Sequence, residues 1–179
     1  MKTLLVALCA VAMAASASAQ NQAPVPPGMP AGIAGLTQSP TPGAHLKPSV
    51  FLQKDVEAQL AALIPDARTK GSSGATLVDY GSYKIQLSVR AASGGAEVHA
   101  HWDDVMMVEQ GSATLVTGGT VVGGTTDSDG ETHGAKIEGG NAQTLAPGDM
   151  VTVRAGTPHQ ILLAPGTIYA ALVVKIHEP

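Results

Sequence analysis

The sequence predicts an all-β barrel or sandwich that is preceded by one short helix. From Thr76 onward, short apolar runs recur with Gly, Pro and Asp turn residues between them. Residues 83–90 show the clearest strand pattern, because apolar and polar side chains alternate there. A helical spacing of apolar residues occurs in residues 54–64, and Pro65 is expected to end that helix. We expect the helix to pack on the outside of the barrel.

The chain divides into three parts by composition. Residues 1–19 are typical of a secretory signal peptide, with a positive charge at Lys2, a short apolar core and small residues at the end. Residues 20–48 are rich in Pro, Gly and Ala, which predicts a disordered tether. Residues 49–179 are expected to form a single domain, with the barrel at about 76–176. The brevity of the signal is typical of bacteria and predicts export to the periplasm or the outside of the cell.

Charge and cysteine content exclude several classes of protein. The net charge is −4 and no basic cluster is present, so nucleic acid is not an expected partner. No apolar run after the signal is long enough for a membrane helix, so no membrane association is expected once the signal is removed. The one cysteine, Cys9, lies inside the predicted signal, so the mature chain is expected to have no disulfide.

Histidines and a carboxylate stand at the spacing of a metal site. His99 and His101 are one residue apart, so on a strand they would project from the same face. Asp104 follows shortly after them, and His159 lies in the last third of the chain. Imidazole nitrogens with one carboxylate suit iron, manganese, nickel, copper or zinc better than calcium or magnesium. Asp104 is either the fourth ligand or the acceptor of a hydrogen bond from a ligand histidine, while Asp103 is expected in solvent.

These residues resemble the two sequence motifs of the cupin superfamily. The matching residues are His99, His101, Asp104 and Gly111 in the first motif and Gly148, Gly156 and His159 in the second. The chain departs from the family pattern at Asp104, where the family has Glu, at Arg154, where it has Pro, and at Leu163, where it has Asn. The resemblance implies a cupin-type double-stranded β-helix, also called a jelly-roll barrel, with one bound divalent transition metal. It also implies that the protein could form a homodimer.

A pocket follows if His99 and His101 point into the barrel. Alternation along the neighbouring strands then predicts a substrate pocket lined by Trp102, Met106, Val108, Arg154, Ile161, Leu163 and Tyr169. Such walls are mostly apolar and would suit a small, partly apolar or planar molecule. Trp102 either covers the pocket mouth or packs outside, Arg154 either orients an anionic substrate or is an exposed charge, and Tyr169 either donates to a ligand or lies in the core.

Residues 118–140 form an excursion rich in Gly, Thr and Asp between the two motifs. We expect a long loop or hairpin there, and loops of this length inside a compact domain are often functional. Its histidine, His133, either faces solvent or closes over the pocket.

Two functions from different classes fit these observations. The first is a metal-dependent enzyme, a dioxygenase-like oxidoreductase or a lyase, that acts on a small molecule in an apolar pocket. The second is a secreted cupin without catalysis, which binds a small molecule or uses the metal to hold the barrel together. No catalytic residue besides the metal ligands is predicted, and an open coordination position would favour the enzyme.

Overall fold

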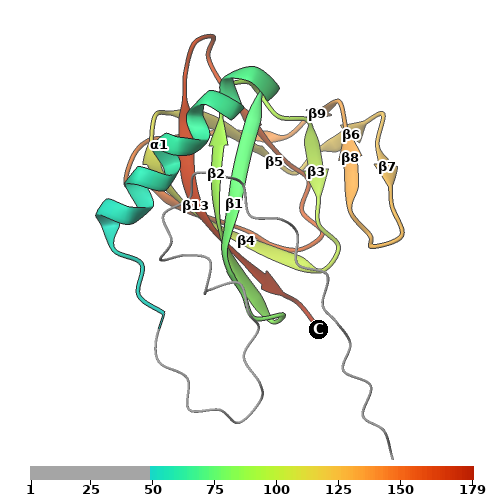
Figure 1. Cartoon of the computed structure of the whole chain (residues 1–179). Helices are drawn as coiled ribbons and strands as arrows, with labels where there is room; N and C mark the ends of the chain where they lie inside the picture. Colours follow the sequence, from blue (N-terminus) through green and yellow to red (C-terminus); the bar gives the residue numbers. More distant parts are fainter. Residues whose placement is uncertain (1–48) are drawn as a thin grey trace, which may run out of the picture.

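The computed structural model describes residues 49–179, so the predicted signal peptide, the predicted tether and Cys9 lie outside the described residues. The described chain forms one helix and two main β-sheets that face each other, as Figure 1 shows. In this part of the chain, no helix has both the length and the apolar character needed to span a membrane.

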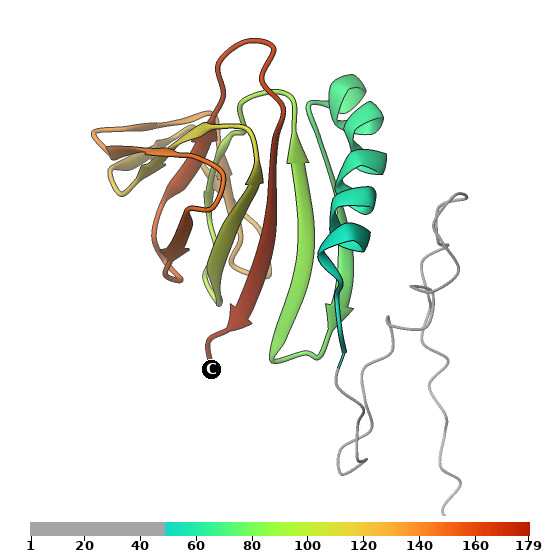
Figure 2. The same ribbon diagram turned by 90° about the vertical axis from the view of Figure 1, so that its left-hand side faces the viewer.

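Helix α1, Gln53–Lys70, lies on the outer face of the five-stranded sheet, where Figure 2 shows it beside β1 and β2. Its start agrees with the sequence, but the predicted end at Pro65 is wrong, because the helix continues for another turn. Ala67, after the proline, is fully buried against the sheet, and this packing outweighs the backbone hydrogen bond that Pro65 lacks. The helix ends at Gly71, whose φ of +90° suits a glycine.

The first sheet has five antiparallel strands in the order β1-β2-β13-β4-β11. Their bounds are Ser72–Asp79 (β1), Tyr83–Arg90 (β2), Tyr169–His177 (β13), Trp102–Gln110 (β4) and Met150–Val153 (β11). Strands from the beginning, middle and end of the chain are therefore neighbours, and the barrel starts slightly before the expected residue 76.

The second sheet has six strands in the order β10-β5-β12-β3-β8-β7, and β6 pairs with β9 in a separate ribbon. Their bounds are Ala96–Val98 (β3), Ala113–Thr117 (β5), Thr120–Val122 (β6), Thr125–Thr126 (β7), Thr132–Gly134 (β8), Lys136–Glu138 (β9), Asn141–Leu145 (β10) and His159–Leu162 (β12). Of the loop or hairpin expected over residues 118–140, the hairpin form is observed, since β7 and β8 pair and extend this sheet while β6 and β9 pair beside it. The predicted jelly roll is confirmed by this topology of two facing sheets.

The orientation of β2 determines which of its two faces, apolar or polar, points into the barrel. Leu87 and Val89 turn outward and pack under α1 in one hydrophobic cluster. Since side chains alternate along a strand, Gln86, Ser88 and Arg90 turn inward, between the sheets. A second hydrophobic cluster fills the space between the sheets further along the barrel. The barrel interior is therefore polar beside β2, although the apolar face of β2 is well buried.

Candidate metal centre

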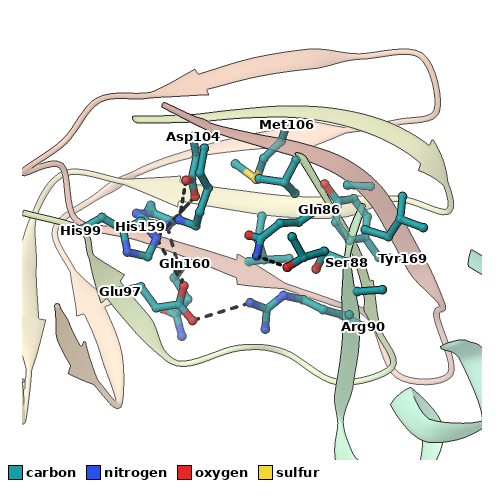
Figure 3. A pocket seen from close by; sticks show the side chains of 18 of the residues that line it. Gln86, Ser88, Arg90, Glu97, His99, Asp104, Met106, His159, Gln160 and Tyr169 are labelled. Atoms are coloured by element: carbon teal, nitrogen blue, oxygen red, sulfur yellow. Dashed lines mark hydrogen bonds and ion pairs between the residues drawn. The ribbon is translucent and has the colours of Figure 1, made fainter. Parts of the chain in front are cut away.

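A cavity of about 370 Å³ lies between the two sheets (Figure 3). Its polar side chains are those of Thr76, Gln86, Ser88, Arg90, Glu97, His99, Asp104, His159, Gln160, Tyr169 and Lys175, and its larger apolar ones are those of Met106, Ile161 and Val173. The walls are mixed and not as apolar as expected, because the inward face of β2 and the end of β13 carry polar and charged side chains.

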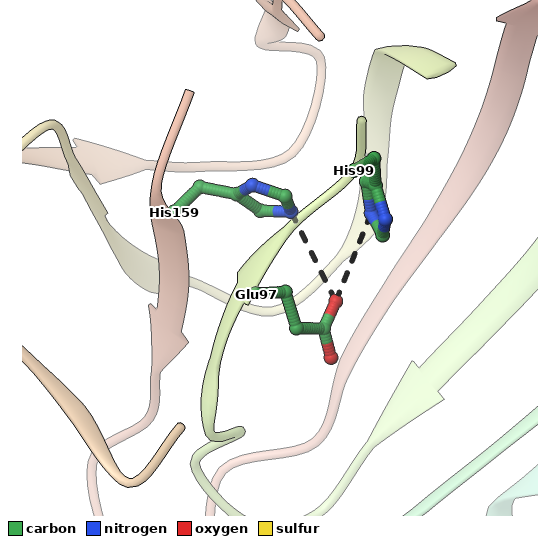
Figure 4. Close-up of side chains that lie close together, drawn as sticks. All are labelled: Glu97, His99 and His159. Atoms are coloured by element: carbon green, nitrogen blue, oxygen red, sulfur yellow. Dashed lines mark ion pairs between the residues drawn. The ribbon is translucent and has the colours of Figure 1, made fainter. Parts of the chain in front are cut away.

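Glu97, His99 and His159 form a cluster at one side of this cavity (Figure 4). Glu97 lies in β3 and His99 just beyond it, while His159 opens β12, whose backbone pairs with β3 so that His159 faces Glu97. The Nε2 atoms of both histidines lie 3.9 Å from Oε2 of Glu97. One donor atom from each residue lies within 4.8 Å of the others, which is the arrangement needed to hold a metal ion.

Asp104 lies beside this cluster, as its place in the sequence motif implies. Its Oδ2 atom is 3.4 Å from Nε2 of His99 and 3.8 Å from Nε2 of His159. Its Oδ1 atom accepts a hydrogen bond of 2.6 Å from Nζ of Lys175. Asp104 therefore lies where a further ligand would lie. The alternative, an acceptor for a ligand histidine, is not favoured, because Asp104 is near Nε2 of His99 while the free nitrogen Nδ1 contacts Glu131.

The other ring nitrogen of each histidine has a partner outside the cluster. Nδ1 of His159 donates to the backbone oxygen of Thr157 at 3.1 Å, since a carbonyl oxygen only accepts. Nδ1 of His99 contacts the carboxylate of Glu131, which the excursion between the motifs brings to the site. Contacts of this kind fix the ring orientation and direct the Nε2 lone pair toward a metal.

The pKa values in the cluster differ because of burial and charge. Burial raises the pKa of Asp104, but hydrogen bonds and charges from His99 and Lys175 outweigh it and lower the pKa overall. Burial lowers the pKa of His159 below its usual value. Burial also opposes protonation of His99, but Asp104 and Glu131 raise its pKa overall. At neutral pH, the site therefore presents an ionised Asp104 and a neutral His159, the forms that bind metal.

His101 does not join this cluster. Strand β3 ends at Val98 and β4 begins at Trp102, so the chain bends between the two histidines. The exposed ring of His101 stacks on His177, with ring centroids 6.2 Å apart. The prediction that His99 and His101 share one strand face is wrong for this reason. The pair with spacing two that does share a face is Glu97 and His99.

Three of the predicted pocket residues line the cavity, namely Met106, Ile161 and Tyr169. Val108 and Leu163 belong to the hydrophobic cluster between the sheets and do not line the cavity.

The two remaining predicted pocket residues lie away from the cavity. Trp102 packs edge-on against His177, with Nζ of Lys84 4.3 Å from its ring centre, so the outer packing role applies. Arg154 is largely exposed, and its Nε atom lies 3.0 Å from Oδ2 of Asp103. The expectation that Asp103 lies in solvent is wrong, because its side chain is mostly buried and Oδ1 accepts from the backbone N–H of Ala155 at 2.7 Å.

Several site residues were not predicted from the sequence. Those in or beside the cavity are Glu97, Arg90, Ser88, Gln86, Lys175 and Glu131. Alternation would have found Glu97, two residues before His99, and Lys175, on the same face of its strand as Tyr169. His133, in contrast, is exposed on β8, so of its two predicted positions it takes the one in solvent.

The donor set of the cluster fits a transition metal. Two imidazole nitrogens and one carboxylate oxygen are ligands that zinc, iron, manganese, nickel and copper share. With metal–ligand bonds of about 2.1 Å, tetrahedral donors are about 3.4 Å apart. The two separations from Glu97 to the histidines are 3.9 Å and all three donor atoms lie within 4.8 Å of one another, so side-chain movements of about an ångström or less would suffice.

Comparisons with known proteins give weak structural likenesses and no sequence family. No family model and no curated protein matches the chain. Among solved structures, it is similar to the polyketide cyclase RemF from Streptomyces resistomycificus, with 20% identity, a TM-score of 0.43, and coverage of 62% of this chain and 69% of that one.

Two other solved structures show a similar degree of likeness. The DMSP lyase DddQ from Ruegeria pomeroyi has 17% identity and a TM-score of 0.43, with coverage of 60% of this chain and 48% of that one. A cupin superfamily protein from Desulfitobacterium hafniense has 18% identity and a TM-score of 0.41, with coverage of 60% of this chain and 78% of that one. The chain thus spans less than half of DddQ, and likenesses this weak carry no argument about its reaction.

Proposed function

We propose that this protein binds one divalent transition metal through Glu97, His99 and His159 and uses it to act on a small molecule in the barrel cavity. One observation supports this most strongly. Both histidines have their Nδ1 atoms engaged by other groups, so their Nε2 atoms face the Glu97 carboxylate within the cavity. A histidine that served only the core would not need this orientation.

A bound metal would polarise a substrate oxygen or activate water or dioxygen, the chemistry of a lyase or a dioxygenase-like oxidoreductase. The chain itself would hold the substrate against the inward face of β2. Lys175 lines the cavity and lies 2.6 Å from Asp104, so it holds that carboxylate in place and presents an N–H donor near the cluster. Met106, Ile161 and Val173 limit the water around the charged groups.

The first experiment is elemental analysis of protein purified without chelators and without a histidine tag. We expect about one equivalent of iron, manganese, nickel, copper or zinc, because three donors converge in the cavity. The His99→Ala variant should lose this metal. The matched control is His101→Ala, which removes a neighbouring but exposed histidine and should keep it. Absence of metal from the wild type, or its loss only in His101→Ala, would overturn the proposal.

A second candidate is a cupin that binds a ligand or metal without catalysis. It is favoured by the pairing of the two cationic side chains in the cavity, since Lys175 contacts Asp104 and Arg90 faces Glu97. A coordination shell without an exchangeable position would support this alternative. Water-proton relaxation of the manganese-loaded protein separates the two, because a fast-exchanging water on the metal indicates an open site.

A further inference from the structure

We propose that Arg90, Ser88 and Tyr169 form a carboxylate subsite, so that the molecule bound in the cavity is a small carboxylic acid in its anionic form. This inference rests on the proposed metal-dependent function, because it assigns the substrate class of the same cavity. Figure 3 shows these three side chains on one side of the cavity and the two histidines on the other.

The three side chains are neighbours on the inner face of the first sheet. Arg90 on β2 is the direct cross-strand partner of Tyr169 on β13, and Ser88 is the partner of Ala171. Side chains at directly opposite positions of an antiparallel pair lie close enough to contact one ligand. The small side chain of Ala171 leaves space between the other three. The register of β2 and β13 thus places three hydrogen-bond donors, one guanidinium and two hydroxyl groups, at the same part of the cavity wall.

The hydroxyl of Tyr169 supplies independent evidence for a ligand. The residue is 2% exposed and lines the cavity, yet its hydroxyl oxygen has no hydrogen-bond partner among the described residues. Buried hydroxyl groups are almost always paired, because an unpaired one costs the free energy of its lost hydration. Burial raises the pKa of Tyr169 more than nearby Arg90 lowers it, so the hydroxyl keeps its proton and can donate. A carboxylate oxygen would supply the missing acceptor.

Arg90 has donors left for a ligand. Its half-buried guanidinium group faces one carboxylate, with Nη2 3.7 Å from Oε1 of Glu97, too far for a hydrogen bond. The other oxygen of Glu97 faces His99 and His159. A guanidinium group carries five N–H donors in a planar fork that matches a carboxylate. A carboxylate on Arg90 would therefore be bound beside the metal cluster, separated from it by the Glu97 side chain.

The charges in the cavity also favour an anion. Arg90 and Lys175 balance Glu97 and Asp104, two positive charges against two negative ones. A divalent metal adds two positive charges, and Glu131 beside His99 offsets only one of them. Uncompensated charge in a partly buried site is unfavourable, so a ligand with one negative charge completes the balance. A neutral molecule of the same shape would leave one positive charge in the cavity without a counter-charge.

The test is calorimetric titration of the metal-loaded protein with butyrate and benzoate, against butanamide and benzamide as neutral analogues of the same shape. We expect the better carboxylate to bind at least about tenfold more tightly than its amide, as for a charge-assisted hydrogen bond. Arg90→Gln should abolish this preference, and Arg90→Lys should restore part of it. The matched control is Arg68→Gln, which removes an exposed arginine on α1 and should change nothing.

Tyr169→Phe gives a second, independent readout. It should weaken carboxylate binding about tenfold or more, since a hydrogen bond to a charged acceptor is lost. It should not lower the melting temperature, because the hydroxyl has no hydrogen-bond partner among residues 49–179. A residue with a merely structural role would show the reverse pattern.

Metal content measured in the same samples separates the two proposals. Bound metal together with equal or undetectable binding of acids and amides overturns the carboxylate subsite and leaves the metal function standing. A preference for acids that depends on Arg90, in protein that holds no metal, overturns the metal function and leaves the subsite standing.

Discussion

At the scale of single residues, Glu131 shows how a distant segment completes the site. The turn before it is held by Oδ1 of Asp127, which accepts from the backbone N–H groups of Asp129 and Glu131 at 2.9 and 3.0 Å. Glu131 thereby reaches Nδ1 of His99 from a part of the chain that lacks any metal-binding pattern. We interpret it as a positioning residue for His99.

Replacing Glu131 by Gln should weaken metal binding about tenfold, because the charged partner that orients a ligand histidine is lost. Competition with a chromophoric chelator measures the dissociation constant of the metal. The matched control is Glu138→Gln, in the same excursion, whose exposed carboxylate pairs with Lys136 and lies outside the cluster. Equal affinities of wild type and Glu131→Gln would contradict the positioning role.

At the scale of elements, the position of α1 explains the polar cavity. The helix covers the apolar face of β2 with Val56 and Leu60, so Leu87 and Val89 are buried on the outside of the barrel. The hydrophobic effect is then satisfied without filling the barrel interior. The polar face of the same strand is free to line the cavity. A short helix thus determines the chemistry of a site that it does not touch.

The turn after β4 offers a test of how tightly the barrel is built. Gly111 has a φ of +71°, and an added Cβ would lie 2.0 Å from the backbone oxygen of Ile168. Gly111→Ala should lower the free energy of unfolding by about 3 kcal/mol, because strain and a backbone clash combine.

The control for this effect is Gly118→Ala. Gly118 has nearly the same φ, +72°, but an added Cβ would meet nothing within 4 Å. This variant should lose only about 1 kcal/mol, the cost of the left-handed conformation. Urea unfolding of both variants measures the difference, and equal losses would show that the contact with Ile168 has no effect.

At the scale of the whole molecule, the metal should stabilise the folded chain, and with Asp104 as a further ligand it would also link the two sheets. Glu97, His99 and His159 come from the second sheet, while Asp104 and Lys175 come from the first. A ligand that binds only the folded protein stabilises it in proportion to its binding free energy.

Metal at one hundred times its dissociation constant should therefore stabilise the fold by about 2.7 kcal/mol. In a domain of this size that corresponds to a rise in melting temperature of roughly 5–10 °C. Thermal unfolding before and after chelator treatment measures the shift. His159→Ala should show no shift with chelator. An unchanged melting temperature of the wild type after chelator treatment would contradict a metal that stabilises the folded chain.

The sequence by itself determined the β architecture, the start of the helix, and the positions of His99, Asp104 and His159. These features follow from local patterns, because alternation, helical spacing and turn residues act over a few neighbours. The same rules placed Met106, Ile161 and Tyr169 at the cavity.

Only the tertiary structure decided which neighbours meet and which face of a strand points inward. His101 lies outside the site because the chain bends after Val98. Helix α1 continues past Pro65 because Ala67 packs on the sheet. Arg90 lies in the cavity because α1 covers the apolar face of β2 and leaves the polar face to point inward. Glu131 reaches His99 from a turn that is distant in sequence. These outcomes depend on packing between segments far apart in the chain, which local propensity does not encode.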